Sequence, residues 1–326
     1  MPWCVAAKLA MHTGWHDTVV REGELIELLL EECSASARDW LTVGPGDDAA
    51  EVDLPGGSRV LLTTDMVVQG LHFEPEVAVR RVAWKAVARS LSDLAGMAAE
   101  PRCSLAAVKF AKDASRTEAR EAVTALAESA EEMEAPLAGG DISVGGGPLS
   151  MTVTSVGTPG PAGRILRSGA RPGDRVCVTG NLGGSIRGRH LDFRPRTREA
   201  LELARRVELH ALIDISDGLS TDVLHIARAS GVGVELQAAV IPVSADARKL
   251  ARETGRRPLW HALNDGEDYE LLFCLPAADA ERLQEEGLPD TPVSVIGTVV
   301  EERTELVDED GTRCPLEAEG WEHSTA

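Results

Sequence analysis

The sequence predicts a protein of the mixed α/β (α+β) class with two domains. Helical and strand-like patterns alternate from Arg21 onward, 43% of the 326 residues are hydrophobic, and a stretch rich in Pro and Gly lies near mid-chain at residues 158–164. A chain of this length can bury two cores. We therefore expect a loose extension over residues 1–20, a first domain over 21–160 and a second domain over 161–326.

The first half begins with a helical pattern at residues 25–32, followed by the strand-like VLLTTD at 60–65. A long helix is expected at about 76–99, because apolar residues recur there on one stripe of a helical surface. A second helix is expected at 116–134, and SMTVTSVG at 150–157 has the pattern of a strand.

The second half repeats the alternation after a turn at residues 171–174. The expected elements are strands at 175–180, 211–215, 232–236, 270–275 and 293–300 and a helix at 220–229.

The charge balance excludes some classes of partner. Lys and Arg number 33 against 53 Asp and Glu, and the resulting charge of −20 repels nucleic acid and anionic membranes. No apolar run approaches the length of a membrane span. The six cysteines are scattered without a CxxC pair, so we expect reduced thiols in a cytoplasmic protein rather than a zinc site or a disulfide framework.

Aspartates recur where apolar strand patterns end beside Gly, Ser or Thr. They are Asp47, Asp48, Asp65, Asp141, Asp214 and Asp217. Strand ends next to tight turns are where α/β sheets bind ligands. Carboxylates that lie close together repel unless a multivalent cation neutralises them. The neighbouring hydroxyls of Thr63, Thr64 and Ser216, with no cluster of His and Cys, favour Mg²⁺ over zinc or copper.

Asp93 gives an independent argument for a charged interior site. It follows Val82 by 93 − 82 = 11 positions, which returns it to within roughly 20° of the apolar stripe of the predicted helix. A carboxylate facing inward needs a cation or partial hydration. Two alternatives are a salt bridge to Arg89 and a helix-end carboxylate turned to solvent.

Mg²⁺ commonly bridges protein carboxylates to phosphate oxygens, which leads from these aspartates to a nucleotide substrate. The sequence contains no GxxxxGK[ST], no GxGxxG opening a helix and no HRD/DFG set. Arg164 and Arg167 are candidates for fixed positive charge beside phosphates, with surface arginines as the alternative. We predict Mg²⁺-dependent phosphoryl transfer from ATP through an aspartate cluster.

Several motifs occur together in the order found in one family. They are GDDAA at 46–50, TTDMVVQGLHF at 63–73, LSDLAGMAAEP at 91–101, GGD at 139–141, RSGARPGD at 167–174, DISDGLSTD at 214–222, GEDYELLF at 266–273 and GWEH at 320–323. In these segments the chain closely resembles the thiamine-monophosphate kinases, which share a superfamily with aminoimidazole ribonucleotide synthetase and selenophosphate synthetase. The resemblance runs from about Arg21 to the C-terminus.

The resemblance implies ATP and thiamine monophosphate as substrates, thiamine diphosphate and ADP as products, and several Mg²⁺ ions. It also implies a homodimer in which the sheet of the N-terminal α/β domain pairs with its twin to form a barrel, with a C-terminal α/β domain completing each site. Because the acceptor is a phosphate monoester that is largely ionised at neutral pH, no general base is required.

Residue roles follow from the matching positions. The implied metal or metal-water ligands are Asp47, Thr63, Thr64, Asp65, Asp93, Asp141, Asp214 and Asp217, among which we take Asp65, Asp141 and Asp217 as the catalytic set. The implied ATP contacts are Gly140, Asp141, Arg167 and Ser216. The implied contacts to thiamine monophosphate are His72, Glu267 and Trp321.

Some positions differ from the family pattern: Gln69 stands where Glu is common, and Ile-Ser-Val follows GGD. A selenophosphate synthetase is the nearest alternative, but it needs a reactive Cys in a glycine context, which Cys4 lacks. A related hydrogenase-maturation enzyme needs a C-terminal Cys. A non-catalytic metal-binding protein is the alternative from another class, and it would bind metal without nucleotide turnover.

Overall fold

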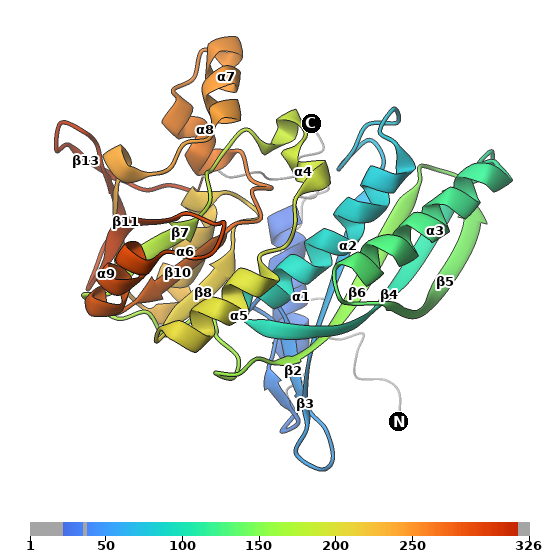
Figure 1. Ribbon diagram of the computed structural model, residues 1–326, viewed down its shortest axis with the longest axis horizontal. Helices are drawn as coiled ribbons and strands as arrows, with labels where there is room; N and C mark the ends of the chain where they lie inside the picture. Colours follow the sequence, from blue (N-terminus) through green and yellow to red (C-terminus); the bar gives the residue numbers. More distant parts are fainter. Residues whose placement is uncertain (1–21, 35–37, 319–326) are drawn as a thin grey trace, which may run out of the picture. The chain divides into compact units, whose positions relative to one another are not determined.

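The computed structural model describes residues 22–34 and 38–318, which are coloured in Figure 1. Helix α1 (Glu22–Ser34) belongs to one compact unit, and every other described element belongs to a second unit. This helix confirms the helical pattern predicted at 25–32, whereas the predicted extension over 1–20 lies outside the described residues. Across the described residues, no helix combines the length and apolar character needed to cross a membrane.

The first sheet of the larger unit has the strand order β1-β2-β3-β6-β4-β5. Its strands are β1 (Leu41–Val43), β2 (Ala50–Asp53), β3 (Arg59–Val68), β4 (Ala99–Ala111), β5 (Leu137–Gly145) and β6 (Ser150–Pro159). Neighbouring strands are antiparallel except for the parallel pair β4 and β5.

Two helices, α2 (Val79–Gly96) and α3 (Arg116–Glu132), pack against each other, and α2 packs against β3 and β6 (Figure 1). The apolar stripe of α2 explains this packing, because Val82, Val87 and Leu91 are fully buried against the sheet. Helix α3 begins at a capping box in which the Ser115 hydroxyl accepts from the Glu118 N–H and the Glu118 carboxylate accepts from the Ser115 N–H.

The second sheet has the order β13-β12-β9-β11-β7-β10-β8 and is antiparallel except for the pair β12 and β9. Its strands are β7 (Arg175–Thr179), β8 (Ala211–Asp214), β9 (Gly233–Gln237), β10 (Leu271–Leu275), β11 (Val293–Val300), β12 (Glu305–Val307) and β13 (Arg313–Pro315). The accompanying α-helices are α4 (Arg189–Asp192), α5 (Thr197–Arg206), α6 (Leu219–Ser230), α7 (Ala245–Thr254), α8 (Pro258–Asn264) and α9 (Ala277–Glu286). The short 3₁₀ helices are η1 (Ser185–Arg187) and η2 (Ala238–Val240).

The predicted mixed α/β class and the predicted alternation are confirmed, with three corrections. Helix α2 is shorter than the predicted 76–99, because Ala98 adopts φ +50° and the chain enters β4 at Ala99. Strand β4 was not predicted, and β5 was expected only as a strand that ends at Asp141; the short strands β1, β2, β12 and β13 and the helices α4, α5, α7, α8 and α9 were also not predicted. Asp65 and Asp141 were predicted at strand ends and lie within β3 and β5, because both strands continue their pairing past the carboxylate.

The two faces of β3 differ in character. Thr63 and Asp65 lie on the same face as the buried Leu61 and Val67, whereas Thr64 and Met66 point to the other side. On that outer face Leu62, Met66 and Leu105 are exposed, and the edge strand β5 exposes Ile142 and Val144. A sheet with an exposed apolar face and an open edge is suited to pairing with another sheet.

Candidate active site

Aspartates from four elements meet on the inner side of β3. They are Asp47 and Asp48 before β2, Asp65 on β3, Asp93 on α2, and Asp214 and Asp217 at and after the end of β8. These carboxylates lie close enough to interact electrostatically, since the charges of Asp65, Asp214 and Asp48 all raise the pKa of Asp93. The structure therefore brings together the aspartates of the sequence motifs, apart from Asp141.

Hydroxyl groups rather than cations hold the two central carboxylates. Thr63 donates to Oδ2 of Asp93, and Ser92 donates to Oδ2 of Asp214. Neither Asp93 nor Asp214 has an ion pair with any described residue, and Asp214 is buried while Asp93 is partly open to solvent. Burial together with the neighbouring carboxylates raises the pKa of Asp93 well above its usual value and that of Asp214 to about 6.

Asp48 is the most constrained carboxylate of the cluster. Its Oδ1 accepts from Nε of Arg167 at 3.0 Å and also from the other end of that guanidinium, while its Oδ2 is buried without a hydrogen-bond partner. A Cβ on Gly96 would lie 2.2 Å from that Oδ2, so only glycine fits there. Burial raises the pKa of Asp48 to about 8, although Arg167 partly offsets the shift.

Two arginines contact carboxylates of the cluster. The backbone N–H of Arg167 donates to Oδ2 of Asp47 at 3.2 Å, which seats the segment after β6 on the turn before β2. Arg89 pairs with Asp65, with 3.3 Å between Nη2 and Oδ1. Of the two alternatives considered for Asp93, the ion pair of Arg89 is with Asp65, although its charge also acts on Asp93, and Asp93 is partly open to solvent while it accepts from Thr63 within the cluster. Arg164, the other predicted phosphate candidate, pairs with the fully buried Glu51 at 3.0 Å.

Asp141, Thr64 and Gly140 lie apart from this cluster. The pairing of Asp141 with Ala107, of Ala107 with Thr152 and of Thr152 with Met66 places the Asp141 side chain on the outer face of the sheet. Thr64 lies on the same face, where its hydroxyl is 3.0 Å from that of Thr154. A Cβ on Gly140 would lie 1.9 Å from the carbonyl oxygen of Ala106, so close packing alone explains why a glycine stands at this position.

A second charged group links the predicted substrate contacts His72 and Glu267. Both contact Lys85 of α2, whose Nζ is 2.6 Å from Oε1 of Glu267 and donates to the His72 carbonyl at 3.0 Å. Burial alone would raise the pKa of Glu267, but the charges of Lys85 and Arg89 outweigh it and hold that pKa below its usual range. The sequence reasoning missed Lys85 and the pairing role of Arg89. A signal was present, because Lys85, Arg89 and Asp93 repeat every four residues on one helix face.

The turn that carries Asp217 has its own support. The buried carboxylate of Asp222 accepts from the backbone N–H groups of Asp217 and Gly218, at 3.2 and 3.1 Å. Ligand atoms of Asp217, Asp222 and His225 lie within 4.8 Å of one another, close enough to hold a cation. Asp222 was also missed as a site residue, although it lies within the DISDGLSTD motif.

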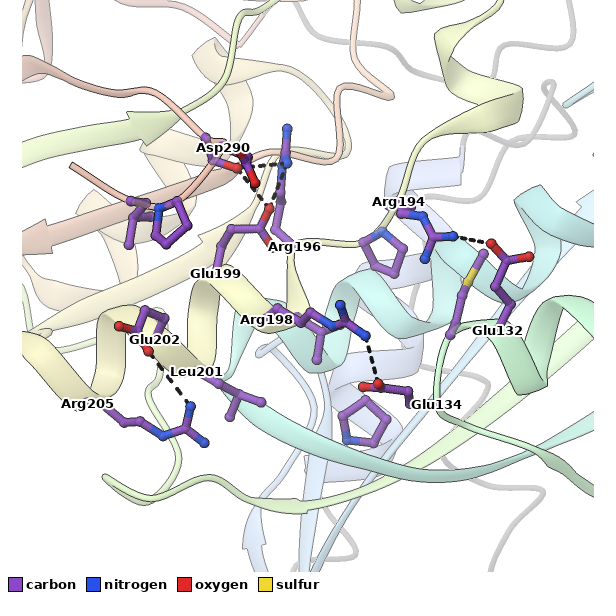
Figure 2. A pocket seen from close by; sticks show the side chains of 17 residues that line it. Glu132, Glu134, Arg194, Arg196, Arg198, Glu199, Leu201, Glu202, Arg205 and Asp290 are labelled. Carbon is purple, nitrogen blue, oxygen red and sulfur yellow. Dashed lines mark hydrogen bonds and ion pairs between the residues drawn. The ribbon is translucent and has the colours of Figure 1, made fainter.

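The large pocket shown in Figure 2, of about 730 Å³, lies away from these residues. Its arginines are matched by acids, as in the pairs Arg194–Glu132 and Arg198–Glu134. None of the predicted site residues lines it. Trp321, a predicted substrate contact, lies outside the described residues.

Two family models match this chain, one in each half. The model for the AIR synthase related protein N-terminal domain matches residues 46–158, and that for the C-terminal domain matches residues 171–309. The chain belongs to the AIR synthase related family and, within it, to the thiamine-monophosphate kinases, as the following relatives show.

The thiamine-monophosphate kinase of Rhodopirellula baltica is 39% identical over 269 residues, which cover 80% of this chain and 84% of that protein. The Escherichia coli K12 enzyme of the same name is 34% identical over 312 residues, covering 88% and 94%. A solved structure of AaThiL complexed with AMPPCP and TMP has a TM-score of 0.77 at 28% identity and covers 93% of this chain and 97% of its own. The family resemblance predicted from the motifs is confirmed.

Proposed function

We propose that this protein transfers the terminal phosphoryl group of ATP to thiamine monophosphate, giving thiamine diphosphate and ADP. The structural observation that carries the proposal is the cluster of carboxylates whose central members, Asp93 and Asp214, have no ion pair among the described residues. Two relatives that match most of the chain are thiamine-monophosphate kinases, and one similar protein was solved with AMPPCP and TMP.

The residues of the cluster fit Mg²⁺. All donors are hard oxygens, their summed charge is negative, and the buried Oδ2 of Asp48 lacks a partner. We assign Asp47, Thr63, Asp65, Asp93, Asp214 and Asp217 as direct or water-mediated ligands. Bound Mg²⁺ would neutralise phosphate charge and help to align the transferring group.

The chain itself supplies position and fixed charge. Arg167, held against Asp47 and Asp48, carries a guanidinium at the edge of the cluster, and Ser216 lies on the turn between Asp214 and Asp217. We assign both to ATP. His72, Glu267 and Trp321 are assigned to thiamine monophosphate. No residue needs to remove a proton from the acceptor, because the phosphate monoester is already largely ionised at neutral pH.

We propose that the protein is a homodimer that pairs its first sheet with that of a twin. The exposed Leu62, Met66 and Leu105 on the outer face support this proposal. The roles assigned to Thr64, Gly140 and Asp141 rest on it, since Thr64 and Asp141 face that surface rather than the cluster of their own chain. The division at residue 160 and the cytoplasmic location also remain proposals.

The direct test is incubation of purified protein with ATP, Mg²⁺ and thiamine monophosphate, with thiamine diphosphate and ADP measured chromatographically. We expect equal amounts of both products and none when thiamine monophosphate is omitted. A synthetase of the selenophosphate type would consume ATP without forming thiamine diphosphate, and a non-catalytic metal-binding protein would consume none. Either outcome would overturn the proposal.

A further inference from the structure

Lys85 is a fully buried lysine in the middle of α2. A buried ammonium group is costly unless it is paired and hydrogen-bonded. Lys85 meets this requirement with two partners from distant parts of the chain, the Glu267 carboxylate and the His72 carbonyl oxygen. Helix α2 therefore holds one charged contact to the segment after β3 and one to the segment before β10.

The segment around His72 is a tight turn with hydrogen bonds of its own, and the Gln69 N–H also ties it to the Leu149 carbonyl at 3.0 Å. The His72 Nδ1 accepts from the Val68 N–H at 3.1 Å, and the Gly70 N–H donates to the Phe73 carbonyl at 2.8 Å. The contact of Lys85 with the His72 carbonyl ties this turn to α2 at the residue that carries the imidazole ring.

The segment around Glu267 is strained. Glu267 and Tyr269 have φ of +52° and +49°, in the left-handed region that non-glycine residues rarely adopt. The strain is held by backbone hydrogen bonds from Glu267 to the Ser216 carbonyl at 2.7 Å and from Tyr269 to the Ile215 carbonyl at 2.8 Å. Such conformations concentrate at functional sites and persist where the surroundings fix them.

The side chain of Glu267 is fixed at one oxygen only. Its Oε1 lies 2.6 Å from Nζ of Lys85 and also accepts from the Tyr269 hydroxyl at 3.4 Å, whereas Oε2 accepts no hydrogen bond from any described residue, and 24% of the side chain is exposed. A carboxylate held at one oxygen and open at the other can accept a hydrogen bond from an amino group or face a cationic ring at a fixed position.

We propose that Lys85 is a positioning residue for the thiamine monophosphate site, where its ammonium group orients Glu267 and the His72 turn toward the cationic, amino-bearing heterocycle of the substrate. The inference rests on the proposed function. Lys85 acts through Glu267 and the His72 turn, so its removal is expected to affect KM for thiamine monophosphate and not KM for ATP.

The test compares Lys85→Met, Glu267→Gln and the double variant with the wild type in steady-state kinetics. We expect each single variant to raise KM for thiamine monophosphate by about ten-fold or more, with KM for ATP changed less than about two-fold. Because Lys85 and Glu267 act as one ion pair, KM for thiamine monophosphate in the double variant is expected to be no higher than in the more impaired single variant.

Ser90→Ala is the matched control. Ser90 is buried on the same helix and donates to the Ser155 hydroxyl at 2.8 Å, so its loss is expected to reduce thermal stability without altering either KM. If Lys85→Met does not fold, Glu267→Gln still tests the inference, because the Glu267 side chain is partly exposed and its substitution is less disruptive to the fold. An unchanged KM for thiamine monophosphate in Glu267→Gln, additive effects in the double variant, or an equal rise of both KM values would overturn the inference.

Failure of the proposed function has a different signature. If the wild type forms no thiamine diphosphate, the proposed function itself falls. If the wild type forms it and the variants keep the wild-type KM for thiamine monophosphate, only the positioning role of Lys85 falls.

Discussion

The substitution Asp48→Asn is expected to stabilise the metal-free protein at alkaline pH. The Asp48 carboxylate is buried, its Oδ2 has no partner, and the carboxylates of Asp47 and Asp214 lie nearby. An amide has nearly the same shape and can keep the contact of Oδ1 with Arg167. The variant therefore removes a charge that folding disfavours while preserving the packing.

The size of the effect follows from the pKa of Asp48, which burial raises from 3.8 to about 8 on folding. Between these two values the folded chain holds a proton that the unfolded chain has lost, so stability falls as pH rises. The slope is about 1.4 kcal/mol per pH unit for one proton. From pH 5 to pH 8 the wild type is thus expected to lose about 4 kcal/mol that Asp48→Asn does not lose.

Urea unfolding of both proteins at pH 5, 6, 7 and 8, with a chelator present, measures this difference. The pair at pH 5 serves as the internal control for packing damage, because the wild-type side chain is protonated there and resembles the amide. The free energies of unfolding should diverge steadily above pH 5. A difference that stays constant from pH 5 to pH 8 would show that Asp48 carries no folding-linked proton and would refute the reasoning.

Three further predictions concern activity. Turnover should require Mg²⁺ beyond the amount that saturates ATP, and a plateau at one Mg²⁺ per ATP in a titration of initial rates would contradict ions held by the protein. Asp65→Asn should lower kcat by about two orders of magnitude or more, because electrostatic stabilisation of the transferring group is lost, and a near-normal rate would remove Asp65 from the metal set. Trp321→Ala should raise KM for thiamine monophosphate by about three- to thirty-fold through loss of a cation–π contact, whereas equal weakening of both substrates would indicate a structural tail.

The sequence predicts best those elements whose period is strong. The stripe of α2 and the apolar runs of β6, β7 and β10 were all predicted close to their observed bounds. Strand β4 was missed because Ala99–Ala111 contains Ala, Pro and Arg, which have weak strand preference alone. Hydrogen-bonded pairing with β6 on one side and β5 on the other stabilises the strand despite the weak strand preference of its residues.

The site, like the fold, contains features that the sequence predicts and features that only the structure reveals. Aspartates beside glycines and hydroxyls are visible in the sequence as a group, and the structure gathers most of them. Which charges pair is a matter of contacts across the fold, such as Lys85 with Glu267, which are 267 − 85 = 182 positions apart. Likewise, only the register of β4 with β5 and β6 reveals that Asp141 faces away from the cluster.

The pairing pattern separates two kinds of carboxylate within one site. Asp48 and Asp65 each have an arginine partner and Glu267 has a lysine partner, so a cation of the chain lies beside each of these carboxylates. Asp93 and Asp214 form no ion pair among the described residues and accept from the hydroxyls of Thr63 and Ser92, although the charges of Arg89 and Arg167 also act on them. Since close carboxylates without a cation favour protonation, a divalent cation gains most by binding there and displacing the protons. Neutralising Asp93 or Asp214 should therefore weaken metal binding more than neutralising Asp65, whose charge Arg89 already offsets in part.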